Sequence, residues 1–226
     1  MLLLLHGAMG YSGDFEAIKN HLPKELECQT IDFPGHGGRH GNDFGDEAFM
    51  QAILDFMTGR ELNKIDIFGY SMGGYVAIQF AIKHPDKVGS IMSLNTIWNW
   101  NEAITQKMVG SLDPVRIKTK VPAFAEQLER IHKPNSWEKL AEKTANYLRE
   151  LELNNGIDKS AIEKLQNPVR IVRGEFDPIV SIESSKLMAD SMQHGCYDEV
   201  KEGKHSLDQI DPKELADGMV QFFLKD

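Results

Sequence analysis

Short, mostly apolar segments alternate with amphipathic segments along this chain, and this alternation restricts the possible folds most strongly. Apolar runs bounded by turn residues are typical of strands that are buried on both faces of a parallel sheet. We expect six strands, at 1–5, 28–33, 64–68, 88–94, 169–173 and 196–200. Helical periodicity predicts helices at 14–22, 46–58, 72–84, 181–193 and 212–224. The pattern predicts an α/β fold with a mainly parallel sheet of about six strands and helices on both faces.

One interval contains helical periodicity but no strand pattern. Between residues 97 and 160, Pro114, Pro122 and Pro134 divide the sequence into short helices. This interval has a net charge of +1, whereas the remainder of the chain carries −10. We therefore predict an α/β core formed by 1–96 and 161–226, with a small helical cap, 97–160, inserted after the fourth strand.

Composition and charge exclude several classes of function. The net charge of −9 repels a phosphate backbone, so we expect no nucleic-acid partner. No stretch approaches the roughly 20 apolar residues of a membrane span, and the run at 1–5 is too short for a signal peptide. We expect a cytoplasmic protein without a membrane partner. Cys28 and Cys196 lie outside any metal-binding motif, so we expect no metal site and two buried free thiols.

The strongest chemical signal is Gly69-Tyr70-Ser71-Met72-Gly73-Gly74, which directly follows a predicted strand and begins a predicted helix. A G-x-S-x-G sequence in this context is typical of a sharp turn that exposes a nucleophilic serine. The helix N-terminus also supplies N–H groups and a positive dipole end for an oxyanion. We therefore predict Ser71 as a catalytic nucleophile.

A serine nucleophile needs a base, and the base needs a carboxylate that orients it. His205 follows the last strand and Asp177 follows the fifth, so both lie where α/β sheets place their sites. Glu175 is the alternative acid, whereas Asn95, after the fourth strand, carries no charge. The remaining histidines are interpreted as follows: His6 as structural, His84 as a helix C-cap, His21, His132 and His194 as solvated, and His36 and His40 as rarer candidates for substrate contact.

Two backbone N–H groups are candidates for an oxyanion hole. Met72 follows the nucleophile, and Ala8 lies in the loop after the first strand. We expect Met9 in the same loop, together with Trp98 and Trp100 after the fourth strand, to bind a small-molecule substrate. The alternative for the two tryptophans is that they belong to the core of the cap.

Five segments of the chain resemble motifs of the α/β-hydrolase superfamily, of the serine esterase-like kind with a short helical cap. They are LLLLHGAMG at 2–10, DFPGHGG at 32–38, GYSMGG at 69–74, RGEFDPIV at 173–180 and GKHS at 203–206. The resemblance implies cleavage of a small carboxylic ester through an acyl-Ser71 intermediate, with His205 as base and Asp177 as acid. It implies no metal and no organic cofactor.

The sequence departs from this family in one respect, because it begins within the strand of the HG motif, whereas two strands usually precede that strand. Either the fold is a minimal version with six strands, or the true start lies upstream. The family's strand order would place 28–33 at one sheet edge. An open edge strand invites pairing with another chain, so we expect this edge to be covered or to form a homodimer. The same order places Cys28 and Cys196 at opposite edges, too far apart for a disulfide.

Two other functions remain open at this point. The motifs also resemble the menaquinone-pathway synthase of the superfamily, a lyase in which the serine acts as a base, and the related C–C bond hydrolases. That chemistry needs arginines in the pocket, and the cap offers only Arg116, Arg130 and Arg149. The third alternative is a non-catalytic ligand receptor, although a receptor needs no general base.

Overall fold

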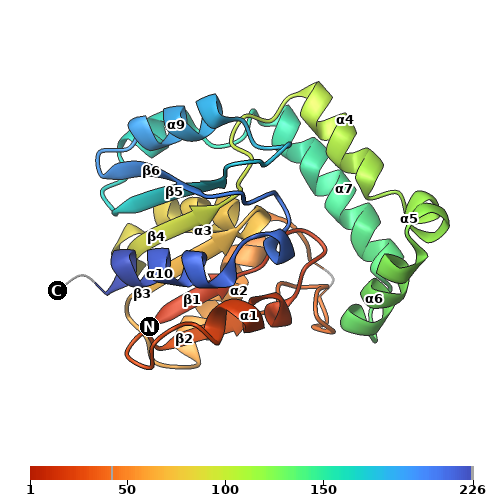
Figure 1. The fold of residues 1–226 in the computed structure, drawn as a ribbon, viewed down its shortest axis with the longest axis horizontal. Helices are drawn as coiled ribbons and strands as arrows, with labels where there is room; N and C mark the ends of the chain where they lie inside the picture. Colours follow the sequence, from red (N-terminus) through yellow and green to blue (C-terminus); the bar gives the residue numbers. More distant parts are fainter. Residues whose placement is uncertain (42, 225–226) are drawn as a thin grey trace.

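The computed structural model describes residues 1–41 and 43–224, and within them six strands form one parallel sheet (Figure 1). The strand order is β2-β1-β3-β4-β5-β6. The strands are β1 (Leu2–Leu5), β2 (Cys28–Ile31), β3 (Ile65–Tyr70), β4 (Val88–Leu94), β5 (Val169–Gly174) and β6 (Gly195–Val200). Every neighbouring pair is parallel, so the predicted fold class is confirmed.

Helices cover both faces of the sheet because the central strands are apolar on both sides. Leu2 and Leu4 of β1 pack in one core cluster, and Leu3 and Leu5 pack in the other, as the alternation of a strand requires. The first cluster lies under α1 (Glu16–Lys19) and α10 (Pro212–Phe223), which are in front of the sheet in Figure 1. The opposite cluster includes side chains of α2 (Asp46–Thr58), α3 (Met72–Lys83) and α9 (Ile182–Asp190). Short 3₁₀ turns complete the core at Ser12–Phe15, Pro85–Lys87 and Leu207–Gln209.

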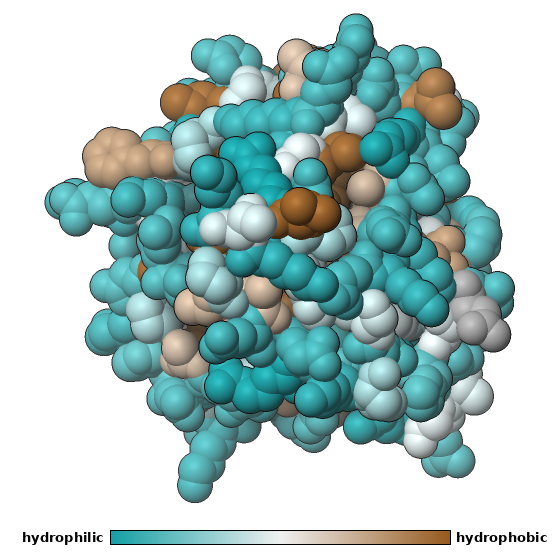
Figure 2. Space-filling model, turned by 90° about the vertical axis from the view of Figure 1, so that its right-hand side faces the viewer, coloured by the Kyte–Doolittle hydropathy of each residue, from teal (hydrophilic) through white to brown (hydrophobic). Residues whose placement is uncertain are grey.

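The small helical cap lies between β4 and β5 and forms the right-hand side of the molecule in Figure 1. It contains α4 (Glu102–Ser111), α5 (Pro114–Lys120), α6 (Pro122–His132) and α7 (Trp137–Leu153). A further short helix, α8 (Lys159–Glu163), leads from the cap back to β5. Pro114 and Pro122 stand in the first turn of α5 and α6, where proline has no intrahelical hydrogen bond to lose. Seen from the cap side, the surface is mainly hydrophilic, with hydrophobic residues in separate places (Figure 2).

The structure corrects three details of the sequence prediction. The helix expected at 14–22 is a 3₁₀ turn followed by α1, which ends at Lys19 as the chain turns toward Pro23. The helix expected at 181–193 ends at Asp190, although Ser181 is its N-cap as predicted. The two thiols are free, but Cys28 is only half-buried and Cys196 is exposed, because both lie on edge strands without an outer neighbour.

The described residues contain neither a membrane-spanning helix nor a cluster of metal-binding side chains. No helix there combines the length and the apolarity that crossing a membrane requires. No group of three or more histidine, cysteine or acidic side chains in residues 1–41 and 43–224 is arranged to hold a metal ion.

Gly73, in the first turn of α3, packs directly against the backbone of β1. A Cβ atom at Gly73 would overlap the carbonyl oxygen of Leu5, and backbone on both sides prevents relief. We expect Gly73→Ala to lower the free energy of unfolding by about 1–3 kcal/mol, as overpacking does. Gly218→Ala in α10 is the control, since nothing lies within 4 Å of its added Cβ. That variant should stabilise by about 0.5–1 kcal/mol. Urea unfolding measures both, and equal effects would contradict the close approach at Gly73.

Candidate active site

Ser71 stands in the turn between β3 and α3 with a strained backbone. Its φ is 51° and its ψ is −114°, a conformation that is costly for a residue with a side chain. Neighbouring contacts hold it there, because its N–H donates to the Leu94 carbonyl (2.8 Å) and its carbonyl accepts from the Thr96 hydroxyl (3.0 Å). A Cβ atom at Gly69 would come within 2.5 Å of the Gly73 carbonyl carbon, so this turn requires glycine. The structure therefore shows the tight strand-to-helix turn that the motif predicts.

Asp177 and His205 are hydrogen-bonded, with 2.8 Å between Asp177 Oδ2 and His205 Nδ1. The other carboxylate oxygen of Asp177 accepts the N–H groups of Ile179 (2.7 Å) and Val180 (3.0 Å). Burial favours a raised pKa for Asp177, but the His205 hydrogen bond and charge, with these two N–H groups, bring its pKa below the ordinary value. The alternative acid, Glu175, is exposed and accepts the N–H of Glu202 (2.8 Å).

Sequence reasoning missed two buried residues that hold these loops in place. Asn95 accepts the N–H of Gly174 (2.7 Å) and donates to the carbonyls of Lys204 (2.7 Å) and His205 (2.9 Å). One amide thus ties the end of β5 to the loop that carries the histidine. The available signal is a polar residue at the end of a buried strand, which the sequence alone shows only as the absence of an acid.

Arg173 is the second such residue, and it shapes the turn around Asp177. Its guanidinium donates to the carbonyls of Val180 (2.7 Å), Glu175 (3.0 Å) and Asp177 (2.7 Å). An arginine is almost never fully buried without partners, yet this residue is only 6% exposed. The RGEFDPIV segment therefore contains its own scaffold as well as the predicted acid.

Ser71 and His205 are connected through the neighbouring residue. Tyr70 donates its hydroxyl to the carbonyl of His205 (3.1 Å), whereas the Ser71 hydroxyl forms no hydrogen bond with His205 in the described part of the chain. Catalytic hydrogen bonds in free enzymes are often long and tighten with substrate. Ser71, Asp177 and His205 follow the carboxyl ends of β3, β5 and β6, so all three lie at the same end of the parallel strands.

Ala8 and Met72 line the same small cavity as Ser71, as an oxyanion hole beside this serine requires. Met72 is the first residue of α3, where N–H groups lack intrahelical partners. Trp100 also lines this cavity of about 30 Å³, and Met9 lines a larger cavity of about 660 Å³ on the far side of Ala8. Trp98 is half-buried and lies outside the lining of both.

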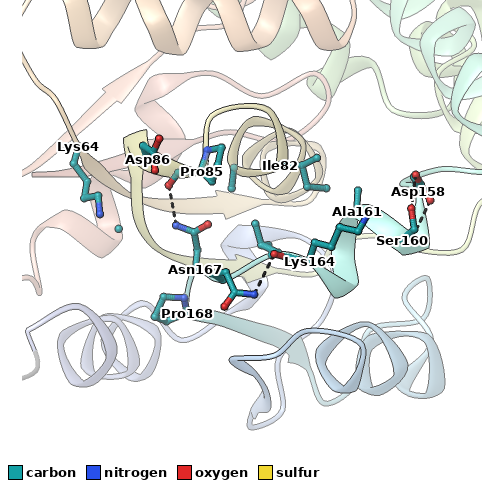
Figure 3. A pocket seen from close by; sticks show the side chains of 14 residues that line it. Lys64, Ile82, Pro85, Asp86, Asp158, Ser160, Ala161, Lys164, Asn167 and Pro168 are labelled. Atoms are coloured by element: carbon teal, nitrogen blue, oxygen red, sulfur yellow. Dashed lines mark hydrogen bonds between the residues drawn. The ribbon is translucent and has the colours of Figure 1, made fainter.

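A third cavity, of about 760 Å³, lies at the opposite end of the sheet (Figure 3). Its lining includes Lys64, Asp86 and Pro168, which precede β3, β4 and β5. Sites of open α/β sheets lie outside the carboxyl ends of the strands. This cavity is therefore remote from the candidate active site, despite its size.

Three buried histidines pack together beside the loop after β1. The ring centroid of His36 is 4.8 Å from that of His6 and 5.9 Å from that of His132. Burial lowers the pKa of His6 to about 4 and also lowers the pKa values of His36 and His132. The expectation that His132 is solvated was wrong, because the last turn of α6 packs its side chain against the core.

Comparison with known proteins agrees with this architecture. The α/β hydrolase fold family matches residues 1–135. The chain belongs to the α/β hydrolase family. This confirms the resemblance that the five motifs indicated.

Two relatives and one solved structure show what this chain is similar to. A "Serine hydrolase-like protein" of Danio rerio is 31% identical over 183 residues, which cover 77% of this chain and 53% of that protein. A "Pimeloyl-[acyl-carrier protein] methyl ester esterase" of Neisseria meningitidis is 33% identical over 88 residues, or 39% of this chain and 33% of the esterase. The chain thus spans about half or less of these two relatives. A thermophilic esterase from Thermogutta terrifontis shares the fold with a TM-score of 0.79 at 19% identity, over 99% of this chain and 89% of the esterase.

The histidine cluster predicts that acid destabilises the fold. Folded His6, His36 and His132 have lowered pKa values, whereas histidines of the unfolded chain bind protons below about pH 6.5. The unfolded state then binds more protons, so the free energy of unfolding falls as the pH drops from about 6.5 toward 4. Urea unfolding at pH 7, 6 and 5 measures this slope. His132→Gln should flatten the slope, and His21→Gln at an exposed position should not. Identical slopes in both variants would contradict the lowered pKa of His132 in the folded protein.

Proposed function

We propose that this hydrolase cleaves a small carboxylic ester, with Ser71 as nucleophile, His205 as general base and Asp177 as the orienting acid. The observation that carries the proposal is the 2.8 Å hydrogen bond between Asp177 and His205. It lies at the carboxyl ends of the strands, where the strained Ser71 turn also lies. This bond directs Nδ1 of the imidazole to the carboxylate and leaves Nε2 for proton exchange with the substrate site.

The reaction proceeds in two steps. Ser71 Oγ attacks the ester carbonyl carbon while His205 takes the hydroxyl proton, and the N–H groups of Ala8 and Met72 stabilise the oxyanion. The carbon–oxygen bond to the alcohol then breaks, and His205 returns the proton to the departing alcohol. Water activated by His205 cleaves the acyl-Ser71 ester and releases the carboxylic acid. Side chains, backbone N–H groups and water supply all the groups that these steps use.

The relatives support an esterase over the other candidate chemistries. Their names include a methyl ester esterase and a monoacylglycerol lipase, both of which are hydrolases of esters. The lyase alternative requires arginines near the serine. The three arginines of the cap, Arg116, Arg130 and Arg149, are exposed and line neither of the two cavities at Ala8. No observation favours a second candidate function.

Labelling with a fluorophosphonate probe tests the nucleophile. We expect one adduct per chain by intact mass, loss of the adduct in Ser71→Ala, and a fall of at least about a thousandfold in kcat for ester hydrolysis. Ser160→Ala is the matched control, because Ser160 is an exposed serine at the start of α8 and should leave labelling unchanged. A folded protein that carries no adduct, or an adduct that persists in Ser71→Ala, would overturn the proposal.

A further inference from the structure

The cavity at Ser71 is small and apolar. Its volume of about 30 Å³ has space for about two water molecules, each of which needs roughly 10–15 Å³. Thr96, Ile97 and Trp100 form the wall that follows β4. Met108 of α4, with Leu148 and Leu151 of α7, closes the cavity from the cap. A group that enters this cavity from the serine therefore has room for about one methyl group.

The larger cavity lies on the side of the general base. Ala8 lines both cavities, so a carbonyl held at its N–H lies next to each of them. Tyr70, Ser206 and Leu207 line the larger cavity, and they are neighbours of His205 in contact or in sequence. The leaving alcohol must lie beside the base that protonates it. The alcohol therefore belongs in the cavity of about 660 Å³, and the acyl group belongs in the small one.

We propose that the enzyme is specific for esters with a short acyl group, of acetyl size, and a larger alcohol, and that Trp100 limits the acyl length. This inference rests on the proposed function. Trp100 is the largest side chain of the small cavity's lining. Its indole N–H is buried without a partner among the described residues, so replacement by phenylalanine costs no hydrogen bond.

The test separates acyl length from alcohol size. The p-nitrophenyl esters of acetate, butyrate and octanoate vary the acyl group, and methyl, phenyl and naphthyl acetate vary the alcohol. We expect kcat/KM to fall about tenfold or more from acetate to octanoate, because methylenes that do not fit cost at least that much. The three acetates should all be cleaved. Trp100→Ala should raise octanoate hydrolysis relative to acetate, with Trp100→Phe intermediate.

Val115→Ala removes apolar volume elsewhere in the cap, at a position that is 70% exposed, and should leave the chain-length profile unchanged. A wild-type preference for octanoate, or a profile that Trp100→Ala does not alter, would overturn the acyl assignment while Ser71 labelling and hydrolysis persist. Absence of both labelling and hydrolysis would instead overturn the proposed function.

A separate set of hydrogen bonds links the cap to the loop at 6–10. His132, at the end of α6, donates from Nε2 to the Met9 carbonyl (3.1 Å) and accepts the Gly37 N–H at Nδ1 (3.1 Å). Its side chain is fully buried. Met9 has a φ of 58°, which is rare for a residue with a side chain and needs support from its surroundings. The Met9 sulfur also lies 3.9 Å from the Thr144 hydroxyl of α7, which donates to the Leu140 carbonyl (2.8 Å).

We infer that His132 is a positioning residue, through which the cap fixes the backbone of Met9 and thereby the direction of the neighbouring Ala8 N–H. This inference also rests on the proposed function. The cap then contributes to stabilisation of the oxyanion as well as to the substrate cavity. Asn135, which follows α6, contacts the same region differently, since its side chain donates to the carbonyls of Gly35 (3.3 Å) and Arg39 (2.9 Å).

Kinetics per active site, titrated with the fluorophosphonate, separate positioning from loss of folded protein. His132→Ala should lower kcat about ten- to a hundredfold with little change in KM, as expected for a misplaced oxyanion donor. His132→Gln should recover part of this loss, because its amide can still donate. Asn135→Ala should keep the wild-type kcat although it also removes a contact between cap and core. An unchanged kcat in His132→Ala, or an equal loss in Asn135→Ala, would overturn the inference.

Discussion

The close packing of the first turn of α3 against the end of β1 fixes the position of Ser71, around which the rest of the site is arranged. Gly73 packs against the backbone of Leu5 so closely that a methyl group would not fit. This contact brings Ser71 beside the loop that carries Ala8, although 63 positions separate them in sequence. The serine and the proposed oxyanion donors are thus juxtaposed by backbone packing, independently of any flexible side chain.

Two buried polar residues hold the remaining parts of the site in place, which are the loops after β5 and β6. Asn95 joins the end of β5 to the histidine loop, and Arg173 closes the turn around Asp177. Buried polar groups of this kind stabilise a structure only when their hydrogen bonds are satisfied. Most N–H groups of the Asn95 and Arg173 side chains donate to backbone carbonyls. These hydrogen bonds therefore hold the loops in place whichever side chains the loops carry.

Much of the fold could be predicted from local patterns, because a strand buried on both faces must be apolar throughout. Leu2–Leu5 shows this directly, and the proline positions likewise located the short cap helices. The candidate site could be predicted where motif and strand end coincide, as for Ser71, Asp177 and His205. The roles of Asn95 and His132 could not, because their partners lie up to 123 positions away and only the packed structure brings them together.

The parallel sheet has a consequence for how this protein folds. Ala8, Ser71, Asn95, Asp177 and His205 follow five different strands, and each neighbouring pair of strands is separated by a crossover. Contacts between residues far apart in sequence form late and slowly, because the chain entropy of closing long loops is lost first. The candidate active site is therefore assembled only when the sheet from β1 to β6 is complete. Recovery of catalytic competence during refolding would report formation of the whole sheet, and a fragment that lacks β5 or β6 would contain an incomplete site.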